Sequence, residues 1–214
     1  MGRFSRHIPN MMTLFNIGAG LASIMLGLWG EYDKAAGLII VSVIVDTFDG
    51  YVARMFNSTS KFGGYLDTVS DFLSFGVSAP LLMYRVYNIG LPVAVFFTLA
   101  SAARLIYFMR TKNPKFFHGL PTTVAGGFIA TIVILKPQLP VEPRLLLLLL
   151  AGLMLMIKLK YYRVDFSSKK TLTIILAVFM YLFVLDLTLA MWAVLFVFLS
   201  YILFGWLKIR EVKG

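Results

Sequence analysis

Two short segments decide the fold of this chain: residues 46–54 read DTFDGYVAR, and residues 63–71 read GGYLDTVSD. They hold four of the ten acidic residues of the chain, Asp46, Asp49, Asp67 and Asp71. All four lie within, or at the end of, apolar stretches long enough to form helices in a membrane. A carboxylate in such a helix costs several kcal/mol unless it is paired, hydrated or bound to a metal. We therefore expect the acids to face one another.

The spacing of the acids predicts how they are arranged. Asp46 and Asp49 are three positions apart on one predicted helix, while Gly63, Asp67 and Asp71 follow at intervals of four on the next. Each set forms one stripe, and the short loop between the helices folds them antiparallel, so the stripes can face each other. Carboxylates placed in this way repel one another. Divalent cations such as Mg²⁺, Mn²⁺ or Ca²⁺, which prefer hard oxygen ligands, would remove the repulsion.

The composition around these segments indicates an integral membrane protein. Of the 214 residues, 59% are hydrophobic and only 14% are charged, whereas a soluble domain carries about a quarter charged residues. Apolar stretches of about 20 residues can cross a bilayer. We expect one domain over residues 1–214, all-α, with about eight spans, although a count of six stays open because the later spans are short. The expected spans lie near residues 11–30, 35–55, 63–86, 91–109, 121–136, 143–158, 171–186 and 188–207.

The basic residues predict the orientation of the chain. With eight spans, 15 of the 20 Lys and Arg fall on the side that carries both termini, and four fall on the other side. Basic loops favour the cytoplasm, so both termini are expected there. The net charge of +10 then indicates contact with an anionic membrane face rather than nucleic acid. The chain has no cysteine, which excludes disulfides and thiolate chemistry.

Read as one string, Asp46-x-x-Asp49-Gly50-x-x-Ala53-Arg54-x8-Gly63-x3-Asp67-x3-Asp71 resembles the signature of the CDP-alcohol phosphotransferase family at all eight positions. The resemblance implies the fold of that family, a six-span core with two further helices here. It also implies an enzyme with two divalent cations, Mg²⁺ or Mn²⁺, for which Ca²⁺ would be a non-productive substitute.

The family pattern also implies a role for each position. Asp46, Asp49 and Asp67 would hold one cation, and Asp46, Asp67 and Asp71 the other. Asp71 would be the general base. Residues 8–18 resemble the first-helix entry of the family, although Asn10 would serve equally well as a helix cap. The residues expected to bind the CDP-linked donor are Asn10, Thr13, Asp49, Gly50, Ala53, Arg54, Gly63 and Asp67.

Two later segments resemble the phosphatidylserine synthase branch of the family: ARLIYF at residues 103–108 and FFHGLPTT at residues 116–123. That branch transfers a phosphatidyl group from CDP-diacylglycerol to L-serine and releases CMP. Thr122 and Thr123 depart from the Ser-Pro or Ile-Pro often found there. An Arg within a span, here Arg104, needs an anionic partner, either a substrate group or one of the four aspartates. The residues expected to bind the acceptor are Arg104, Gly119, Pro121 and Thr122.

Other interpretations stay open from the sequence. The same chemistry could use glycerol 3-phosphate, inositol or an inositol phosphate, or a CDP-archaeol donor, but an anionic acceptor would want more basic residues beside Asp71 than Arg104. A cation or proton transporter could also carry an acid cluster, and it would release no CMP. The expected partners are CDP-diacylglycerol or CDP-archaeol, L-serine, membrane lipids and a second copy in a homodimer. The expected location is the plasma membrane of a prokaryote, with the site near the cytoplasmic face.

Overall fold

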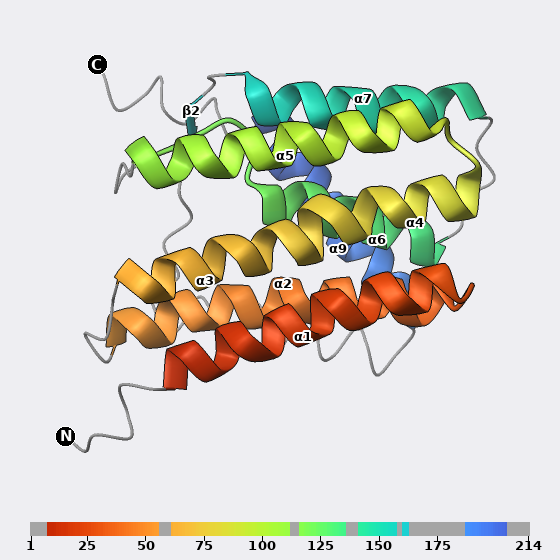
Figure 1. Cartoon of the computed structure of the whole chain (residues 1–214). Coiled ribbons are helices and arrows are strands. Elements are labelled where there is room, and N and C mark those ends of the chain that lie inside the picture. Colours follow the sequence, from red (N-terminus) through yellow and green to blue (C-terminus); the bar gives the residue numbers. More distant parts are fainter. Residues whose placement is uncertain are drawn as a thin grey trace.

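The computed structural model describes residues 8–55, 61–111, 116–135, 141–157, 160–162 and 187–204. These residues form a bundle of helices that lie side by side, with one short pair of strands (Figure 1). The helical elements are α1 (Ile8–Leu28), α2 (Tyr32–Met55), α3 (Lys61–Asp71), η2 (Phe72–Val77), α4 (Ser78–Tyr87), α5 (Leu91–Thr111), α6 (Thr122–Leu135), α7 (Val141–Met156) and α9 (Leu187–Phe204). The prediction of an all-helical fold class is confirmed, apart from the strands.

The expected spans match these helices closely. Seven of the eight coincide with a helix, counting α3, η2 and α4 as one continuous run. The expected span near 171–186 lies outside the described residues.

The turn between α1 and α2 shows how a local signal ends a helix. Gly30 has a φ of +87°, a left-handed conformation that glycine adopts without cost. The backbone N–H of Glu31 donates to the carbonyl of Leu26 at 2.9 Å, and that of Gly30 donates to Gly27 at 3.4 Å. These two bonds form a Schellman motif. The turn folds α1 back against α2, which places the start of α1 beside the end of α2 (Figure 1).

A π-helical stretch, η2, joins α3 to α4 directly after Asp71. Small residues allow neighbouring helices to approach it closely. A Cβ added at Gly20 of α1 would lie 3.0 Å from the backbone nitrogen of Ser74, and one at Gly126 of α6 would lie 2.9 Å from Cα of Phe75. Small residues that let helix backbones approach closely in this way are typical of helix packing in membranes. The segment after Asp71 is thus held between α1 and α6.

Helix α6 lies inside the bundle. It contacts α2, α4, η2 and α9, and ten of its residues are buried. Its start is fixed by two three-residue strands, β1 (Phe116–His118) and β2 (Lys160–Tyr162), which pair antiparallel. The sequence did not predict this strand pair.

Within the residues that the structure describes, two helices, over Asn10–Leu28 and Leu91–Arg110, are long and apolar enough to cross a membrane. Helix α6 has 14 residues, so it is about 21 Å long at 1.5 Å per residue, which is less than the roughly 30 Å of a hydrocarbon core. The eight-span count is therefore not confirmed. Many large apolar side chains are nevertheless exposed on α1, α5, α7 and α9, as expected for a surface in contact with lipid.

Candidate functional site

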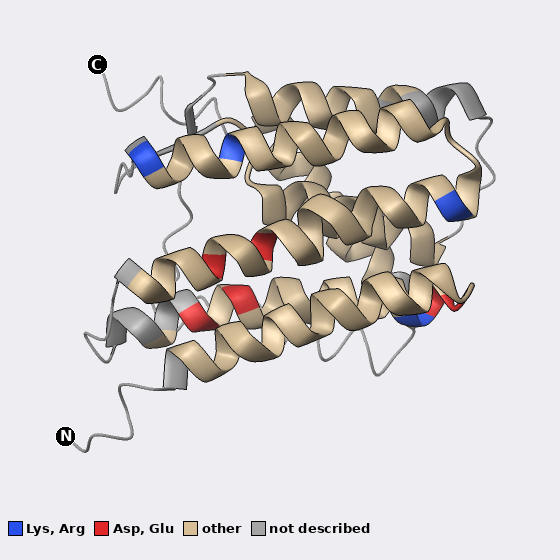
Figure 2. Ribbon diagram, viewed as in Figure 1, with Lys and Arg blue, Asp and Glu red and all other residues tan. Residues whose placement is uncertain are grey.

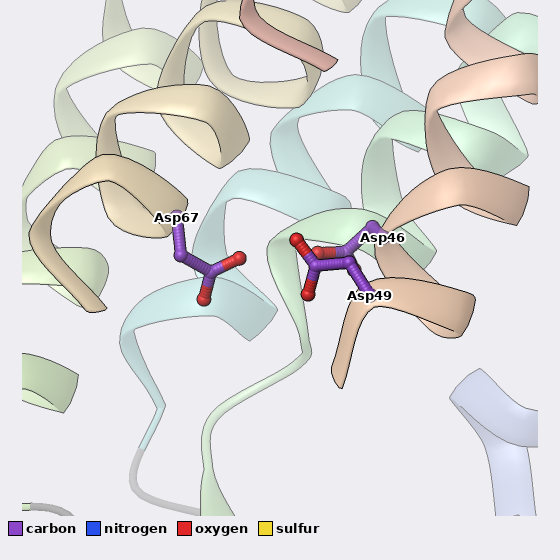
Figure 3. Close-up of side chains that lie close together, drawn as sticks. All are labelled: Asp46, Asp49 and Asp67. Carbon is purple, nitrogen blue, oxygen red and sulfur yellow. The ribbon is translucent and has the colours of Figure 1, made fainter. Parts of the chain in front are cut away.

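Helices α2 and α3 bring three of the predicted acids together. Asp46 and Asp49 lie on neighbouring turns of α2, Asp67 lies on α3, and their carboxylates point toward one another (Figure 3). One carboxylate oxygen from each lies within 4.8 Å of the other two. Figure 2 shows the acidic residues of α3 gathered in one region of the bundle with those near the end of α2, while the acidic residue in the first turn of α2 lies at the opposite end. The stripes predicted from the spacing are confirmed for these three residues.

The fourth acid, Asp71, lies one turn beyond Asp67 on α3. It is outside the close group of three, but it interacts electrostatically with Asp46, Asp67 and Asp49. Its Oδ1 atom is buried and has no hydrogen-bond partner. A buried polar atom without a partner is uncommon. This atom lies beside the other three acids and is open to a contact with a ligand.

The chemistry of these residues fits a divalent cation. Carboxylate oxygens are the ligands that Mg²⁺, Mn²⁺ and Ca²⁺ prefer. Two oxygens bound to one such cation at about 2.0–2.6 Å lie at most about 4–5 Å apart, and the three carboxylates meet this condition within 4.8 Å.

Two threonines from flanking helices hold the acids of α2. Thr13 of α1, only 4% exposed, donates a hydrogen bond from Oγ1 to Oδ2 of Asp49 at 2.9 Å. Thr123 of α6 donates from Oγ1 to Oδ2 of Asp46 at 3.2 Å. Each carboxylate keeps further lone pairs for other ligands, because an ionised carboxylate accepts about four hydrogen bonds. Thr13 was expected near the nucleotide, and the structure places it against a predicted metal ligand.

Arg104 of α5 lies next to the acids and is 7% exposed. Its Nη1 donates to Oγ1 of Thr122 at 2.7 Å, and the guanidinium interacts electrostatically with Asp71. The Nε atom is buried without a hydrogen-bond partner. Two of the residues predicted to bind an acceptor, Arg104 and Thr122, are therefore in direct contact beside the predicted base.

The segment before α6 has a fixed backbone. Gly119 is buried with a φ of +79°, and an added Cβ there would clash with the carbonyl oxygen of Leu155. The N–H of Leu120 donates to the carbonyl of Met154 at 3.0 Å. Pro121 is buried and directly precedes α6. This turn sets where the side chains of the first turn of α6 point.

The other predicted donor-binding residues are only partly visible. Asn10 is half-buried near the start of α1, and Gly63 lies on α3 one turn before Asp67. Gly50, Ala53 and Arg54 lie on the last turns of α2, but their side chains are outside the described part of the chain.

Sequence reasoning missed Thr123 as a site residue. It was noted only as a departure from the branch pattern, yet it contacts Asp46 directly. The signal that could have found it was its place beside Thr122 at the expected start of a helix that follows the Gly-Leu-Pro turn.

Comparison with known proteins finds one matching family. The sequence profile of the family described as CDP-alcohol phosphatidyltransferase matches residues 6–206. A CDP-diacylglycerol–serine O-phosphatidyltransferase from Methanocaldococcus jannaschii is 32% identical over 207 residues, which cover 94% of this chain and 93% of the relative.

Two further relatives carry related names. A CDP-diacylglycerol–serine O-phosphatidyltransferase from Helicobacter pylori is 36% identical over 135 residues, which cover 59% of this chain and 57% of the relative. An archaetidylserine synthase from Methanothermobacter thermautotrophicus is 29% identical over 171 residues, covering 77% of this chain and 73% of the relative. The match thus spans little more than half of the Helicobacter protein and nearly all of the Methanocaldococcus protein.

Proposed function

The chain belongs to the CDP-alcohol phosphatidyltransferase family, and on that premise we propose that it transfers a phosphatidyl group from CDP-diacylglycerol to L-serine. The products are phosphatidylserine and CMP. The observation that carries the proposal is the meeting of three carboxylates from α2 and α3 within 4.8 Å, with a fourth, Asp71, one turn further along α3 and in electrostatic contact with them, in the spacing of the family signature. The relatives named for this reaction support the choice of acceptor.

The proposed cofactors are two divalent cations, Mg²⁺ or Mn²⁺, with Ca²⁺ as a non-productive substitute. Asp46, Asp49 and Asp67 would hold one, and Asp46, Asp67 and Asp71 the other. When bound, the pair offsets negative charge on the attacking and leaving oxygens of the phosphoryl group. Three of these carboxylates have the spacing of ligands to a single ion, within 4.8 Å.

Asp71 is the proposed general base. The serine hydroxyl gives its proton to this carboxylate, and its oxygen forms a bond to the phosphorus that bears the lipid. The bond from that phosphorus to the bridging oxygen breaks, and CMP leaves with the electron pair. The buried and unpartnered Oδ1 of Asp71 supports this role, because an atom with no other partner is available to accept a proton.

The proposed donor site lies along α1, α2 and the start of α3. Thr13 of α1 donates a hydrogen bond to Asp49, and Asn10 lies one turn before it on the same helix. Gly63 lies one turn before Asp67 on α3. Gly50 and Ala53 would leave room for the cytidine, and Arg54 would contact the phosphates.

Arg104 is the proposed anchor for the serine carboxylate. It is buried, lies beside Asp71 and has an unpartnered Nε. Gly119, Pro121 and Thr122 would form the wall behind it. One buried guanidinium suits a zwitterionic amino acid, whereas an acceptor with a phosphate group would want more positive charge. Truncating a guanidinium that meets a carboxylate costs about 2–5 kcal/mol.

The lipid tail of the donor is a separate question, because one relative is named archaetidylserine synthase. A CDP-archaeol donor would place the same CDP group in the same site. Competition between ester-linked and ether-linked CDP-lipids in one reaction would distinguish the two.

The proposed setting is the plasma membrane of a prokaryote, with eight spans, both termini in the cytoplasm and the chain paired as a homodimer. Exposed apolar side chains on four helices support a membrane setting. Helix α2 has 24 residues and is long enough to cross, but it carries the acids of the site, which lowers its apparent hydropathy.

A panel of radiolabelled acceptors tests the proposal. The purified protein is incubated with Mn²⁺, CDP-diacylglycerol and, separately, serine, glycerol 3-phosphate, inositol or inositol phosphate. We expect CMP release and a labelled lipid with serine alone. Product with another acceptor would replace serine but keep the reaction class. Metal binding without CMP release for any acceptor would favour a cation transporter.

A further inference from the structure

Threonines in the described part of this bundle commonly satisfy their hydroxyl groups within their own helix. Thr47, Thr68, Thr98 and Thr131 each donate to the carbonyl four residues earlier, at 2.8–3.1 Å. Thr123 differs, because its hydroxyl crosses from α6 to the carboxylate of Asp46 on α2. The residue four positions before Thr123 is Gly119, which precedes the helix, so the usual acceptor is not in place.

The carboxylate that Thr123 contacts occupies a special position. Asp46 is the one acid of α2 proposed to serve both cations. A hydrogen bond to Oδ2 uses one of about four acceptor positions on the carboxylate and restricts rotation about its side-chain bonds. Groups that hold a metal ligand in this way typically change metal affinity or activity 10–100-fold when removed.

We infer that Thr123 is a positioning residue for Asp46, which sets how this carboxylate presents its oxygens to the cations. The inference rests on the proposed metal site and adds a residue that the family signature does not contain. Thr13 of α1 contacts Asp49 in the same way, through a hydrogen bond from its hydroxyl to the carboxylate. Asp46 and Asp49 are therefore each oriented by a hydroxyl from a different neighbouring helix.

Helix α6 also packs on α2 at a point away from this hydroxyl. The backbone of Gly127 approaches α2 so closely that an added Cβ would lie 3.1 Å from a methyl carbon of Val43. Removing the Thr123 hydroxyl should therefore leave the two helices together and alter only the freedom of Asp46. The loss should appear in metal binding before it appears in stability.

The test compares Thr123→Val, which is nearly isosteric but lacks the hydroxyl, with Thr123→Ser, which keeps it. Thr131→Val is the matched control, since Thr131 is on the same helix, is fully buried and bonds only Gly127 of its own helix. Mn²⁺ alone is titrated into the full-length purified protein, and free Mn²⁺ is followed by electron paramagnetic resonance. CMP release is measured in parallel as a function of Mn²⁺ concentration.

We expect Thr123→Val to bind Mn²⁺ about 10–100-fold more weakly, and Thr123→Ser and Thr131→Val to bind it as the native protein does. In the CMP assay the Mn²⁺ requirement of Thr123→Val should rise by a similar factor, and turnover should recover at high Mn²⁺. The inference would be overturned if Thr123→Val bound Mn²⁺ as tightly as the native protein does. It would also be overturned if Thr131→Val lost as much Mn²⁺ affinity as Thr123→Val.

Failure of the inference can be separated from failure of the metal site. If the native protein binds Mn²⁺ and Thr123→Val binds it equally well, only the role of Thr123 is wrong. If the native protein itself binds no Mn²⁺, the metal site is wrong and the inference with it. Thermal unfolding without metal checks each variant, and Thr123→Ala replaces the valine variant if that one is poorly folded.

Discussion

The guanidinium of Arg104 donates a hydrogen bond to the hydroxyl of Thr122 at 2.7 Å, which joins α5 to the first turn of α6 beside the acid cluster. The bond holds the charged group in place while leaving its Nε without a partner. The arrangement suits a group prepared to receive a carboxylate.

Replacing Arg104 with alanine should therefore weaken acceptor binding selectively. We expect the KM for serine to rise at least about tenfold, because a desolvated carboxylate would lose its charged partner, while the KM for CDP-diacylglycerol changes little. Steady-state CMP release at varied serine and at varied donor measures both constants. Arg110→Ala is the control, since Arg110 lies on the same helix but is exposed. An unchanged serine KM would assign Arg104 a structural role.

Replacing Asp71 with asparagine should remove the general base and keep the shape of the side chain. Turnover should fall by about 10²–10⁴-fold, the usual contribution of a positioned base, and binding of the CDP-lipid should be largely retained. CMP release and a separate donor-binding assay measure the two effects. Asp33→Asn removes the same charge from the other end of α2, at an exposed position, and should be active. Near-normal turnover in Asp71→Asn would assign the proton transfer to another group.

Removing divalent cations should stop the reaction. Without them, the carboxylates of the four acids would repel the phosphates of the donor, and nothing would offset the charge on the phosphoryl oxygens. Treatment with EDTA should reduce CMP release to background, and added Mn²⁺ or Mg²⁺ should restore it. Added Ca²⁺ should compete without supporting turnover. Activity that survives complete chelation would contradict the proposed centre.

Replacing Gly119 with alanine should cost more stability than the same change at Gly30. Both glycines have left-handed backbones, with φ of +79° and +87°, and this conformation costs an alanine roughly 1–2 kcal/mol. Gly30 has open space for a Cβ, whereas Gly119 does not. Thermal unfolding of the two variants isolates the effect of the clash. Equal destabilisation would mean that the chain before α6 can move away from Leu155.

The acid cluster could be predicted from the sequence because its geometry is local. Helical periodicity places Asp46 with Asp49, and Gly63 with Asp67, on single faces, and the short loop between the two helices brings the faces together. Membrane burial adds a strong energetic reason for the acids to meet. These two constraints were sufficient to predict that the three acids, which the structure places within 4.8 Å of one another, would meet.

The contacts of α6 could not be predicted in the same way. Thr123 meets Asp46 from 77 positions away, and no periodic pattern reports which helices are neighbours in a bundle. The strand pair of β1 and β2 also joins segments distant in sequence. The number of spans depends on where α6 and α7 sit in the bilayer, and short apolar helices do not specify this.

The π-helical stretch after Asp71 sets the rotation of α3 relative to α4, and so limits which changes in length the segment between them can accept. In an ordinary helix each residue turns the chain by about 100°, so the wider turns of η2 change the angular offset between α3 and α4. Loss of a single residue from Phe72–Val77 would swing the carboxylate stripe away from α2 while α4 stayed seated on its neighbours. We therefore expect an insertion or deletion within Phe72–Val77 to impair the reaction, even where the segment remains as apolar as before.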